Sequence, residues 1–245
     1  MTMIKAIDLS KRYSDGTLAL DALNLEVSAG EIYCLLGANG AGKTTTLNLF
    51  MNFTRPTAGR VEIHGIDATR RAREAKRHVA YLMESVALYG SLTAMQNLDF
   101  FARLGGRDEL TSEDYGMAMR RVGLPERSFE QRVHKFSRGM RQKLGIAMAM
   151  IKQAPAIFLD EPLAGLDPQA AVELVETLKM LRDEGRAILL STHDLFNAKH
   201  LADTVGILKE GRKVLSCTRE ELRYESLEDL YLDYMRGGVD SQPAA

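Results

Sequence analysis

The sequence predicts an α/β fold with a mainly parallel sheet, an antiparallel β subdomain at the N-terminus and an inserted helical subdomain. Short apolar runs alternate with helical segments in two parts of the chain, first from about residue 23 to residue 65 and again from residue 156 onward. Between about residues 91 and 151 the apolar residues recur at helical spacing instead. The first two stretches predict one α/β core, and the third predicts helices inserted into it.

The first α/β stretch contains two strands and a helix. Leu23, Leu25 and Val27 alternate with polar residues, as in a half-buried strand, and the run IYCLL (Ile32–Leu36) has the length of a fully buried one. The Gly-rich segment GANGAG follows directly, and residues 43–51 have the pattern of a helix. The turn TRPTAG ends this helix before a further short strand, VEIHG.

The remainder of the chain contains the helical insertion and the second α/β stretch. The insertion, placed at about residues 85–152, carries one apolar helical face. This face comprises Leu92, Met95, Leu98, Phe101 and Ala102. The strands AIFLDE, AILLSTHD and TVGILKEG then alternate with helices after Pro168 and near Leu201. Residues 216–245 predict a short C-terminal extension with a helix over Ser226–Met235 and a frayed tail from Gly237.

Composition narrows the function classes. The chain has 245 residues with Lys+Arg 32 against Asp+Glu 33, so no global field attracts nucleic acid, and no nucleic-acid partner is expected. Cys34 and Cys217 lack metal-ligand spacing, which fits a reducing, cytoplasmic setting. The longest apolar runs are too short to cross a bilayer. If the protein serves a membrane, we expect another chain to span it.

A phosphate-binding loop follows the buried strand. Gly37, Gly42, Lys43 and Thr44 satisfy the pattern G-x-x-x-x-G-K-[ST] in the required strand–loop–helix context. Backbone N–H groups of the loop would surround the phosphates of ATP, Lys43 would neutralise the β and γ phosphates, and Thr44 would bind Mg²⁺. The other nucleotide-contacting residues expected here are Asn39, Gly40, Ala41 and Thr45. The alternative is a chance Gly-rich turn.

Two adjacent acids follow the strand AIFLDE. The strand would deliver Asp160 and Glu161 to its carboxyl end, the edge of an α/β sheet where ligands bind. Asp160 would hold the magnesium shell, and Glu161 would act as general base toward the attacking water. The alternative is that the pair only begins a helix, where acidic residues are favoured.

The segment HKFSRGMRQKLGIAMAM, from His134 to Met150, has Ser137 and Gly139 where its helix should begin. By itself a basic helix of this kind is most often only a solvated face. Ser137 could also cap the helix, leaving unpaired N–H groups at its start to face an anion. Gly139 would permit close approach of that anion to the backbone.

With these motifs in place, the sequence resembles a nucleotide-binding subunit of an ATP-binding cassette (ABC) transporter, from Ile4 to about Lys213. FSRGM stands where that family carries its LSGGQ signature, with Ser137 and Gly139 retained. The resemblance implies that residues 1–215 form the ATPase domain. It also implies that the signature of one subunit closes on the ATP held by the phosphate loop of another, either a second copy or a homologous subunit.

The resemblance assigns further residues. Tyr13 matches the aromatic that stacks on adenine, although a surface tyrosine is the alternative. His193 matches the histidine that contacts the γ-phosphate and would join Lys43 and Glu161 as a catalytic residue, although an isolated histidine is more often structural. Residues 164–167 match the loop that bridges the two ATP sites.

Two positions depart from the family pattern. Glu84 stands where a glutamine usually links magnesium to the membrane subunit; glutamate keeps an oxygen ligand but adds a negative charge near the γ-phosphate. Arg138 occupies a signature position that is commonly glycine. Met140 also differs, and the resulting Ser-x-Gly-Met pattern is similar to that of the exporters with separate membrane subunits.

The function implied is an ATP-hydrolysing subunit that powers a transporter by dimer closure and reopening. It would need ATP, Mg²⁺ and a separate multi-span membrane permease, and it would sit peripherally on the inner face of the cell membrane. The short C-terminal extension favours an exporter. The alternatives are a soluble ABC-type ATPase and a phosphate-loop kinase; the latter would leave the signature and His193 unexplained.

Overall fold

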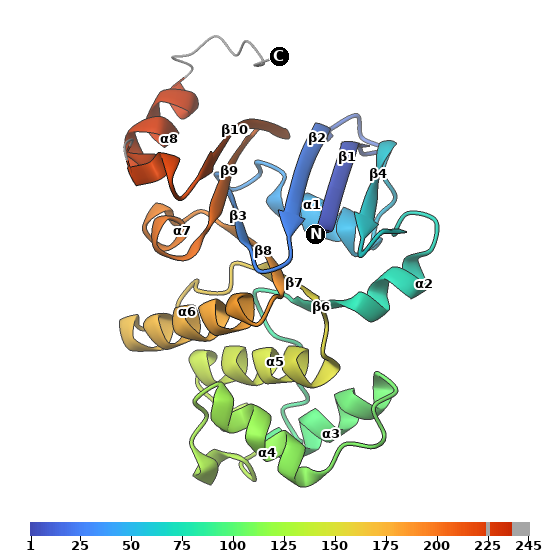
Figure 1. Cartoon of the computed structure of the whole chain (residues 1–245), viewed down its shortest axis with the longest axis vertical. Helices are drawn as coiled ribbons and strands as arrows, with labels where there is room; N and C mark the ends of the chain where they lie inside the picture. The colour runs from blue at the N-terminus through green and yellow to red at the C-terminus, as the bar shows by residue number, and fades with distance from the viewer. Residues whose placement is uncertain (224–225, 237–245) are drawn as a thin grey trace.

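A six-stranded sheet forms the centre of the molecule, with strand order β10-β9-β3-β8-β7-β6 (Figure 1). The computed structural model describes residues 1–223 and 226–236; the predicted tail from Gly237 lies outside them. The strands of this sheet are β3 (Ile32–Leu36), β6 (Val79–Leu82), β7 (Ala156–Asp160), β8 (Ala187–Thr192), β9 (Thr204–Lys209) and β10 (Arg212–Thr218). From β9 to β6 the neighbouring strands are parallel, and β10 is antiparallel to β9.

A second, antiparallel sheet has the order β2-β1-β4-β5. Its strands are β1 (Thr2–Arg12), β2 (Leu18–Ser28), β4 (Ala58–Ile63) and β5 (Ile66–Asp67). Strand β1 was not predicted from the sequence, because its alternation of apolar and polar residues is interrupted. Asp8 has φ 47° there, and the pairing with β2 shifts register between Ala6 and Leu9. The predicted fold class is nevertheless confirmed.

The helices occupy defined places around the sheets. They are α1 (Lys43–Phe50), α2 (Ala72–Ala75), α3 (Ala94–Leu104), α4 (Ser112–Arg121), α5 (Arg138–Lys152), α6 (Pro168–Asp183), α7 (Leu195–Leu201) and α8 (Leu227–Arg236). Helices α3, α4 and α5 lie between β6 and β7 in the sequence and form the end of the molecule opposite α8 (Figure 1). No helix among the described residues is both long and apolar enough to cross a membrane.

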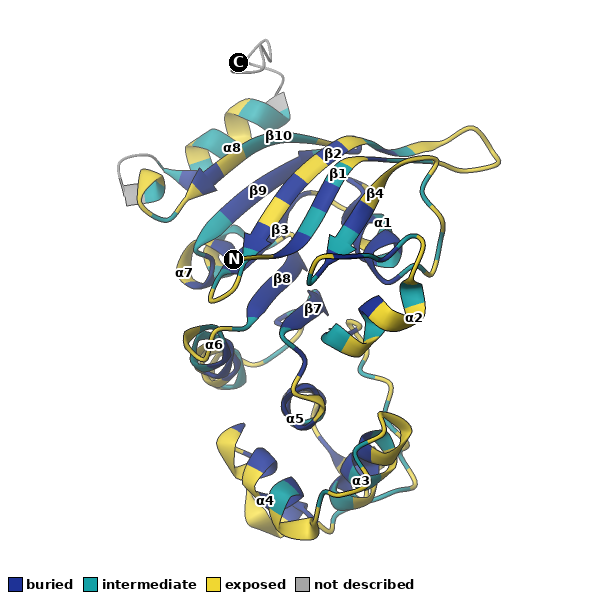
Figure 2. Cartoon of the chain, turned by 45° about the vertical axis from the view of Figure 1, so that its right-hand side comes forward, coloured by how far each residue is buried: buried dark blue, intermediate teal, exposed yellow. Residues whose placement is uncertain are grey.

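Strand β3 is buried on both faces, which explains its uninterrupted run of apolar residues. Successive side chains of a strand point to opposite faces, so Tyr33 and Leu35 pack into the core shared with the antiparallel sheet. Ile32, Cys34 and Leu36 pack into the core on the other face, which extends to the helices α3 to α6. Figure 2 shows β3, β8 and β7 as buried strands, whereas α3 and α4 expose much of their surface.

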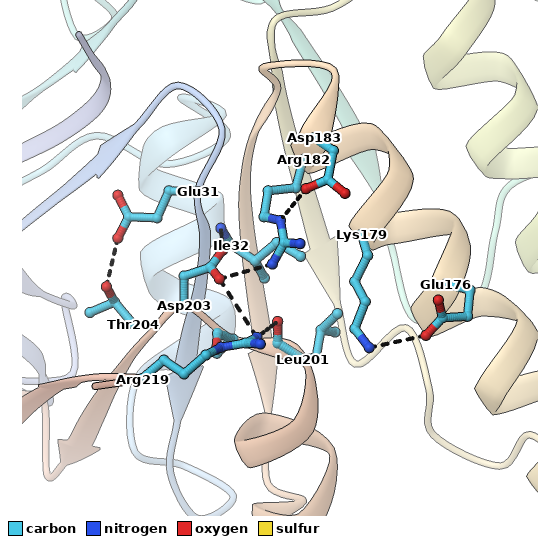
Figure 3. Close-up of polar contacts among 11 residues, drawn as sticks. Glu31, Ile32, Glu176, Lys179, Arg182, Asp183, Leu201, Asp203, Thr204 and Arg219 are labelled. Carbon is cyan, nitrogen blue, oxygen red and sulfur yellow. Dashed lines mark hydrogen bonds and ion pairs between the residues drawn. The ribbon is translucent and has the colours of Figure 1, made fainter. Parts of the chain in front are cut away.

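Asp203 ties together the edge of the sheet at which β3 and β9 begin (Figure 3). One of its carboxylate oxygens accepts a hydrogen bond from Ile32 N at 2.9 Å, and the other contacts Arg182 at 2.9 Å and Arg219 at 3.6 Å. Arg219 also donates to the carbonyls of Leu201 and Ala202 at the end of α7. These contacts join α6, α7 and β10 at the edge opposite the carboxyl ends of the parallel strands.

Replacing this carboxylate should destabilise the fold. Asp203→Ala leaves a backbone N–H and two guanidinium groups without their shared acceptor, so the free energy of unfolding should fall by about 2–3 kcal/mol. Asp183→Ala is the matched control, because among the described residues its exposed carboxylate pairs only with Arg182; it should change stability by at most about 0.5 kcal/mol. Urea denaturation measures both values, and equal losses would contradict this role of Asp203.

Candidate active site

Three neighbouring strands end at the candidate site. Gly37 follows β3, Glu161 follows β7 and His193 follows β8. The sheet order places β8 between β3 and β7, all three parallel, so their carboxyl ends lie at one edge. Gly37 is thereby brought to the same edge as Glu161 and His193, which lie more than 100 positions later in the sequence. This is the edge where α/β sheets bind ligands.

The loop from Gly37 to Gly42 depends on glycine for steric reasons. A side-chain carbon at residue 37 would come within 2.5 Å of the carbonyl oxygen of Leu208. Gly42 has φ 110°, and a side-chain carbon there would lie 2.6 Å from the carbonyl oxygen of Ala19. Gly42 is also the N-cap of α1, which has no side-chain cap. The first N–H groups of α1 therefore lack a capping side chain and are suited to an anion.

Lys43 is held against this loop. Its ammonium donates to the carbonyl oxygens of Gly37 at 2.7 Å and Ala38 at 3.3 Å, and it lies 3.5 Å from the Glu161 carboxylate. Its side chain is only 6% exposed. A buried ammonium with an adjacent carboxylate can exchange that partner for a phosphate at little electrostatic cost.

Asp160 connects the phosphate loop to the neighbouring strands. Its carboxylate accepts hydrogen bonds from the Thr44 hydroxyl at 3.2 Å and from the Ser191 hydroxyl at 2.5 Å. Ser191 was not predicted from the sequence as a site residue. The signal available was a hydroxyl in the otherwise apolar strand AILLS, and its role becomes visible only through the register that pairs Asp160 with Ser191.

Glu161 occupies a strained turn beside His193. Its φ of 47° lies in the left-handed region, which is unfavourable for a residue with a side chain. Its N–H donates to the carbonyl oxygen of Ser191 at 3.1 Å, and its carboxylate contacts Nδ1 of His193 at 3.0 Å. The Glu161 side chain is 13% exposed and that of His193 is 55% exposed. The carboxylate is thus fixed in place, and the imidazole remains accessible.

The carboxylates and the burial of this edge influence nearby groups. Burial raises the pKa of the Cys34 thiol, and the negative charge of Glu161 raises it further. Burial, followed by the charge of Asp160, raises the pKa of Tyr81 to about 12. Cys34 is therefore protonated at neutral pH and cannot serve as a thiolate nucleophile.

A cleft of about 720 Å³ adjoins Glu161 and His193. It lies between the loop after β7, helix α6 and helix α7, and its wall includes the exposed apolar side chains of Val172 and Phe196. Tyr13 is not among the residues that line this cleft; its hydroxyl is 3.5 Å from that of Thr45, and the Lys11 ammonium lies over its ring.

The signature segment begins α5, away from the phosphate loop of the same chain. Ser137 is the N-cap, and its hydroxyl accepts a hydrogen bond from Met140 N at 3.2 Å. The helix has no acidic residue in its first turn. A hollow of about 320 Å³ is lined by Ser137, Gly139 and Asp167, among others. This helix start therefore directs the positive end of the α5 dipole toward the hollow.

Glu84 does not contact Thr44 or Asp160 within hydrogen-bond distance. Its carboxylate instead pairs with Arg138 at 3.2 Å, and its carbonyl oxygen accepts from Gln142 at 3.1 Å. The structure thus brings Lys43, Thr44, Asp160, Glu161 and His193 together, whereas Glu84, Ser137 and Gly139 lie at the start of α5.

The fold and these strand-end groups define a nucleotide-hydrolysing protein of the phosphate-loop class. The model of the ABC transporter family matches residues 20–164. The bacitracin transport ATP-binding protein BcrA of Bacillus licheniformis is 35% identical over 245 residues, which cover 100% of this chain and 77% of that protein. The lantibiotic transport ATP-binding protein SrtF of Streptococcus pyogenes is 34% identical over 94% of this chain and 96% of its own length.

Solved structures agree with these relatives. An ATP-binding subunit of an ABC transporter has a TM-score of 0.83 at 32% identity, with 95% of this chain and 99% of that chain covered. The dimeric cassette MJ0796 in a post-hydrolysis state, bound to ADP and Pi, has a TM-score of 0.80 at 25% identity, with 89% and 99% covered. The chain belongs to the ABC transporter family. It is an ATP-binding subunit, an ATPase that powers transport.

The steric constraint on the phosphate loop can be tested without a ligand. Gly42→Ala places a side-chain carbon against the Ala19 carbonyl at positive φ, so it should lower the free energy of unfolding by about 3 kcal/mol. Gly40→Ala is the matched control, since Gly40 also has positive φ but faces open space; it should cost only about 1–2 kcal/mol. Chemical denaturation compares the two variants, and an equal cost would rule out the predicted clash.

Proposed function

We propose that this chain is the ATP-hydrolysing subunit of an exporter whose membrane-spanning part is a separate protein. The observation that carries the proposal is the convergence of Lys43, Asp160, Glu161 and His193 at the ends of three neighbouring strands. Relatives named for bacitracin transport, lantibiotic transport and daunorubicin resistance support an exporter.

The nucleotide would bind across the phosphate loop. The uncapped N–H groups at the start of α1 and the Lys43 ammonium would hold the phosphates, and Tyr13 would stack on adenine. The residues proposed to contact ATP within the subunit are Tyr13, Gly37, Asn39, Gly40, Ala41, Gly42, Lys43, Thr44 and Thr45. On ATP binding, the Lys43 ammonium would exchange its contacts with the Gly37 carbonyl oxygen and the Glu161 carboxylate for contacts with the phosphates.

The residues beside the loop fit a magnesium ion. The Thr44 hydroxyl and the Asp160 carboxylate lie 3.2 Å apart and supply hard oxygen ligands. Mg²⁺ prefers one or two carboxylates together with phosphate oxygens. We therefore propose Thr44, Asp160 and Glu84 as the residues that hold the ion, with Glu84 joining only after it leaves Arg138. The bound ion would supply charge neutralisation at the phosphates.

Glu161 would act as the general base. It would accept a proton from water as the water oxygen bonds to the γ-phosphorus and the bond to the bridging oxygen of ADP breaks. Its fixed backbone and its contact with His193 hold the carboxylate in one orientation. The exposed His193 imidazole would contact the γ-phosphate, so these two residues and Lys43 are the proposed catalytic residues.

Two subunits would enclose the ATP. The hollow that Ser137 and Gly139 line includes no residue of the subunit's own phosphate loop, and the start of α5 would present N–H groups to the γ-phosphate held by a partner. The partner would be a second copy or a homologous subunit. Closure would also cover the exposed apolar side chains of Val172 and Phe196 beside the loop of residues 164–167.

A groove between the sheet edge and the helical end would receive the membrane protein. Its volume is about 340 Å³, and its apolar lining includes Val86, Phe101 and the exposed side chains of Met83 and Leu104. Glu84 lies next to this groove, so motion at the ATP site would reach the permease through it.

We also propose residues 1–215 as the ATPase domain, 85–152 as its inserted helical subdomain and 216–245 as an extension. The subunit would be peripheral on the cytoplasmic face.

Replacing the proposed base should separate binding from hydrolysis. Glu161→Gln keeps the size of the side chain but cannot accept the proton, so ATP hydrolysis should fall by about 10²-fold or more while ATP binding persists. The trapped ATP should stabilise a dimer, which size-exclusion chromatography with light scattering would detect. Glu113→Gln, on the exposed face of α4 and outside the cleft that adjoins Glu161, is the control and should hydrolyse normally. Normal hydrolysis by Glu161→Gln would refute the base assignment.

Partner identification tests the transport role. The tagged subunit should be purified from detergent-solubilised membranes of its native cell, and its stoichiometric partners identified by intact mass. Recovery of a multi-span membrane protein with two nucleotide-binding chains would support the proposal and distinguish a homodimer from a heterodimer. If the subunit is recovered without any membrane-spanning partner, the transport role is contradicted and a soluble ABC-type ATPase is favoured.

A further inference from the structure

The two charged departures from the family pattern contact each other. Glu84 replaces the usual glutamine, and Arg138 replaces a common glycine of the signature. Although these residues are 54 positions apart, Nη2 of Arg138 donates to Oε1 of Glu84 at 3.2 Å. Gln142, one turn further along α5, donates to the Glu84 carbonyl oxygen at 3.1 Å. The segment after β6 is therefore held against the start of α5 by a charge pair and an amide.

Arg138 also contacts the loop that follows Glu161. A side-chain carbon placed at Gly165 would lie 3.1 Å from Nη1 and 3.4 Å from Cζ of Arg138. The guanidinium thus lies between the segment carrying Glu84 and the loop of residues 164–167. Both members of the ion pair are accessible, with side chains 43% and 59% exposed. An exposed ion pair of this kind is weak: it changes the equilibrium constant between the paired and the separated side chains by about five-fold at most. Arg138 can therefore exchange Glu84 for another partner.

The position of Arg138 favours a partner that carries more negative charge than the Glu84 carboxylate. It is the first residue of α5, next to the capping residue Ser137, and the first turn of this helix contains no acidic residue. A cation at a helix N-terminus is unfavourable unless an anion compensates both the charge and the helix dipole. A terminal phosphate carries more charge than one carboxylate, and a planar guanidinium can bind it with two parallel hydrogen bonds.

We propose that Arg138 changes partners during the ATPase cycle. It pairs with Glu84 while the subunits are apart, and it binds the γ-phosphate of the ATP held by the other subunit in the closed dimer. Its departure releases Glu84 toward the magnesium site of its own subunit. This inference rests on the proposed head-to-tail dimer. Because the two residues of one pair then serve different ATP molecules, the pair links the two sites through a single subunit.

The proposed exchange predicts that substitutions of Glu84 and of Arg138 change the stability of the ATP-bound dimer in opposite directions. The measurement is the dimer dissociation constant at saturating ATP, obtained by sedimentation in the Glu161→Gln background so that hydrolysis does not interfere. Glu84→Gln removes the ion pair that closure must break but keeps a side-chain oxygen for the magnesium site, so it should lower this constant by roughly two- to five-fold. Arg138→Ala removes the contact with the γ-phosphate and should raise it by about ten-fold or more. Arg138→Lys keeps the positive charge but lacks the planar guanidinium, so its dissociation constant should lie between those of the parent protein and Arg138→Ala.

A double variant separates the exchange from simple repulsion. Glu84→Gln also removes a negative charge from the vicinity of the phosphate, which could favour closure by itself. In the Arg138→Ala background no pair remains to break, so the gain from Glu84→Gln should disappear. Arg120→Ala is the matched control: this arginine of the same helical region pairs with Glu113 and Glu126 and is 44% exposed, close to the exposure of Arg138. It should leave the dissociation constant unchanged.

Several outcomes would overturn the exchange. An unchanged constant in Arg138→Ala would exclude a contact between Arg138 and the γ-phosphate. A constant raised equally by Glu84→Gln and Arg138→Ala would mean that the ion pair persists in the closed dimer. A gain from Glu84→Gln that survives in the double variant would assign the effect to repulsion. By contrast, absence of any ATP-dependent dimer in the Glu161→Gln background itself would refute the proposed head-to-tail dimer, and the exchange with it.

Discussion

The parallel pairing of β3 and β7 on either side of β8 is the constraint on which the site depends. It places the phosphate loop, Asp160 with Glu161 and His193 at one edge, although these segments are far apart in the sequence. All three strands are buried on both faces, so a register shift would disrupt the packing of both cores and separate the Asp160 carboxylate from Ser191. At the opposite edge, Asp203 fixes the start of β3 through its bond to Ile32.

The sequence predicted the elements whose signals are local. The run Ile32–Leu36 predicted β3 with both bounds correct, because the run is too short for a helix and has turn residues on both sides. The phosphate loop and the acids after AIFL were also predicted from local signals, since each follows a short apolar run directly. Strand β1 was missed, since the irregular backbone at Asp8 interrupts its alternation. The polar contacts of Ser191 and Arg138 were also missed, because pairing register and subdomain contacts determine them.

The start of α5 differs in kind from the strand-end site. Lys43, Asp160 and Glu161 are positioned by a buried sheet, whereas Arg138 and Glu84 are exposed and joined by a weak ion pair. Rigid groups suit the chemistry of phosphoryl transfer, which relies on preorganised charge. Weak, exchangeable contacts suit a surface that must dissociate from one partner and bind another in each cycle. The two kinds of site thus match the fixed and the moving parts of the proposed cycle.

Mixing two inactive variants would test the central claim that each ATP is held between subunits. Lys43→Ala disables the phosphate loop, while Ser137→Asp keeps a good helix cap but repels the γ-phosphate. Each variant alone should hydrolyse little ATP. On mixing, heterodimers contain one site with both parts intact, so the account predicts that hydrolysis returns to a fraction of the wild-type rate. A mixture no more active than the sum of the separate variants would contradict the composite site.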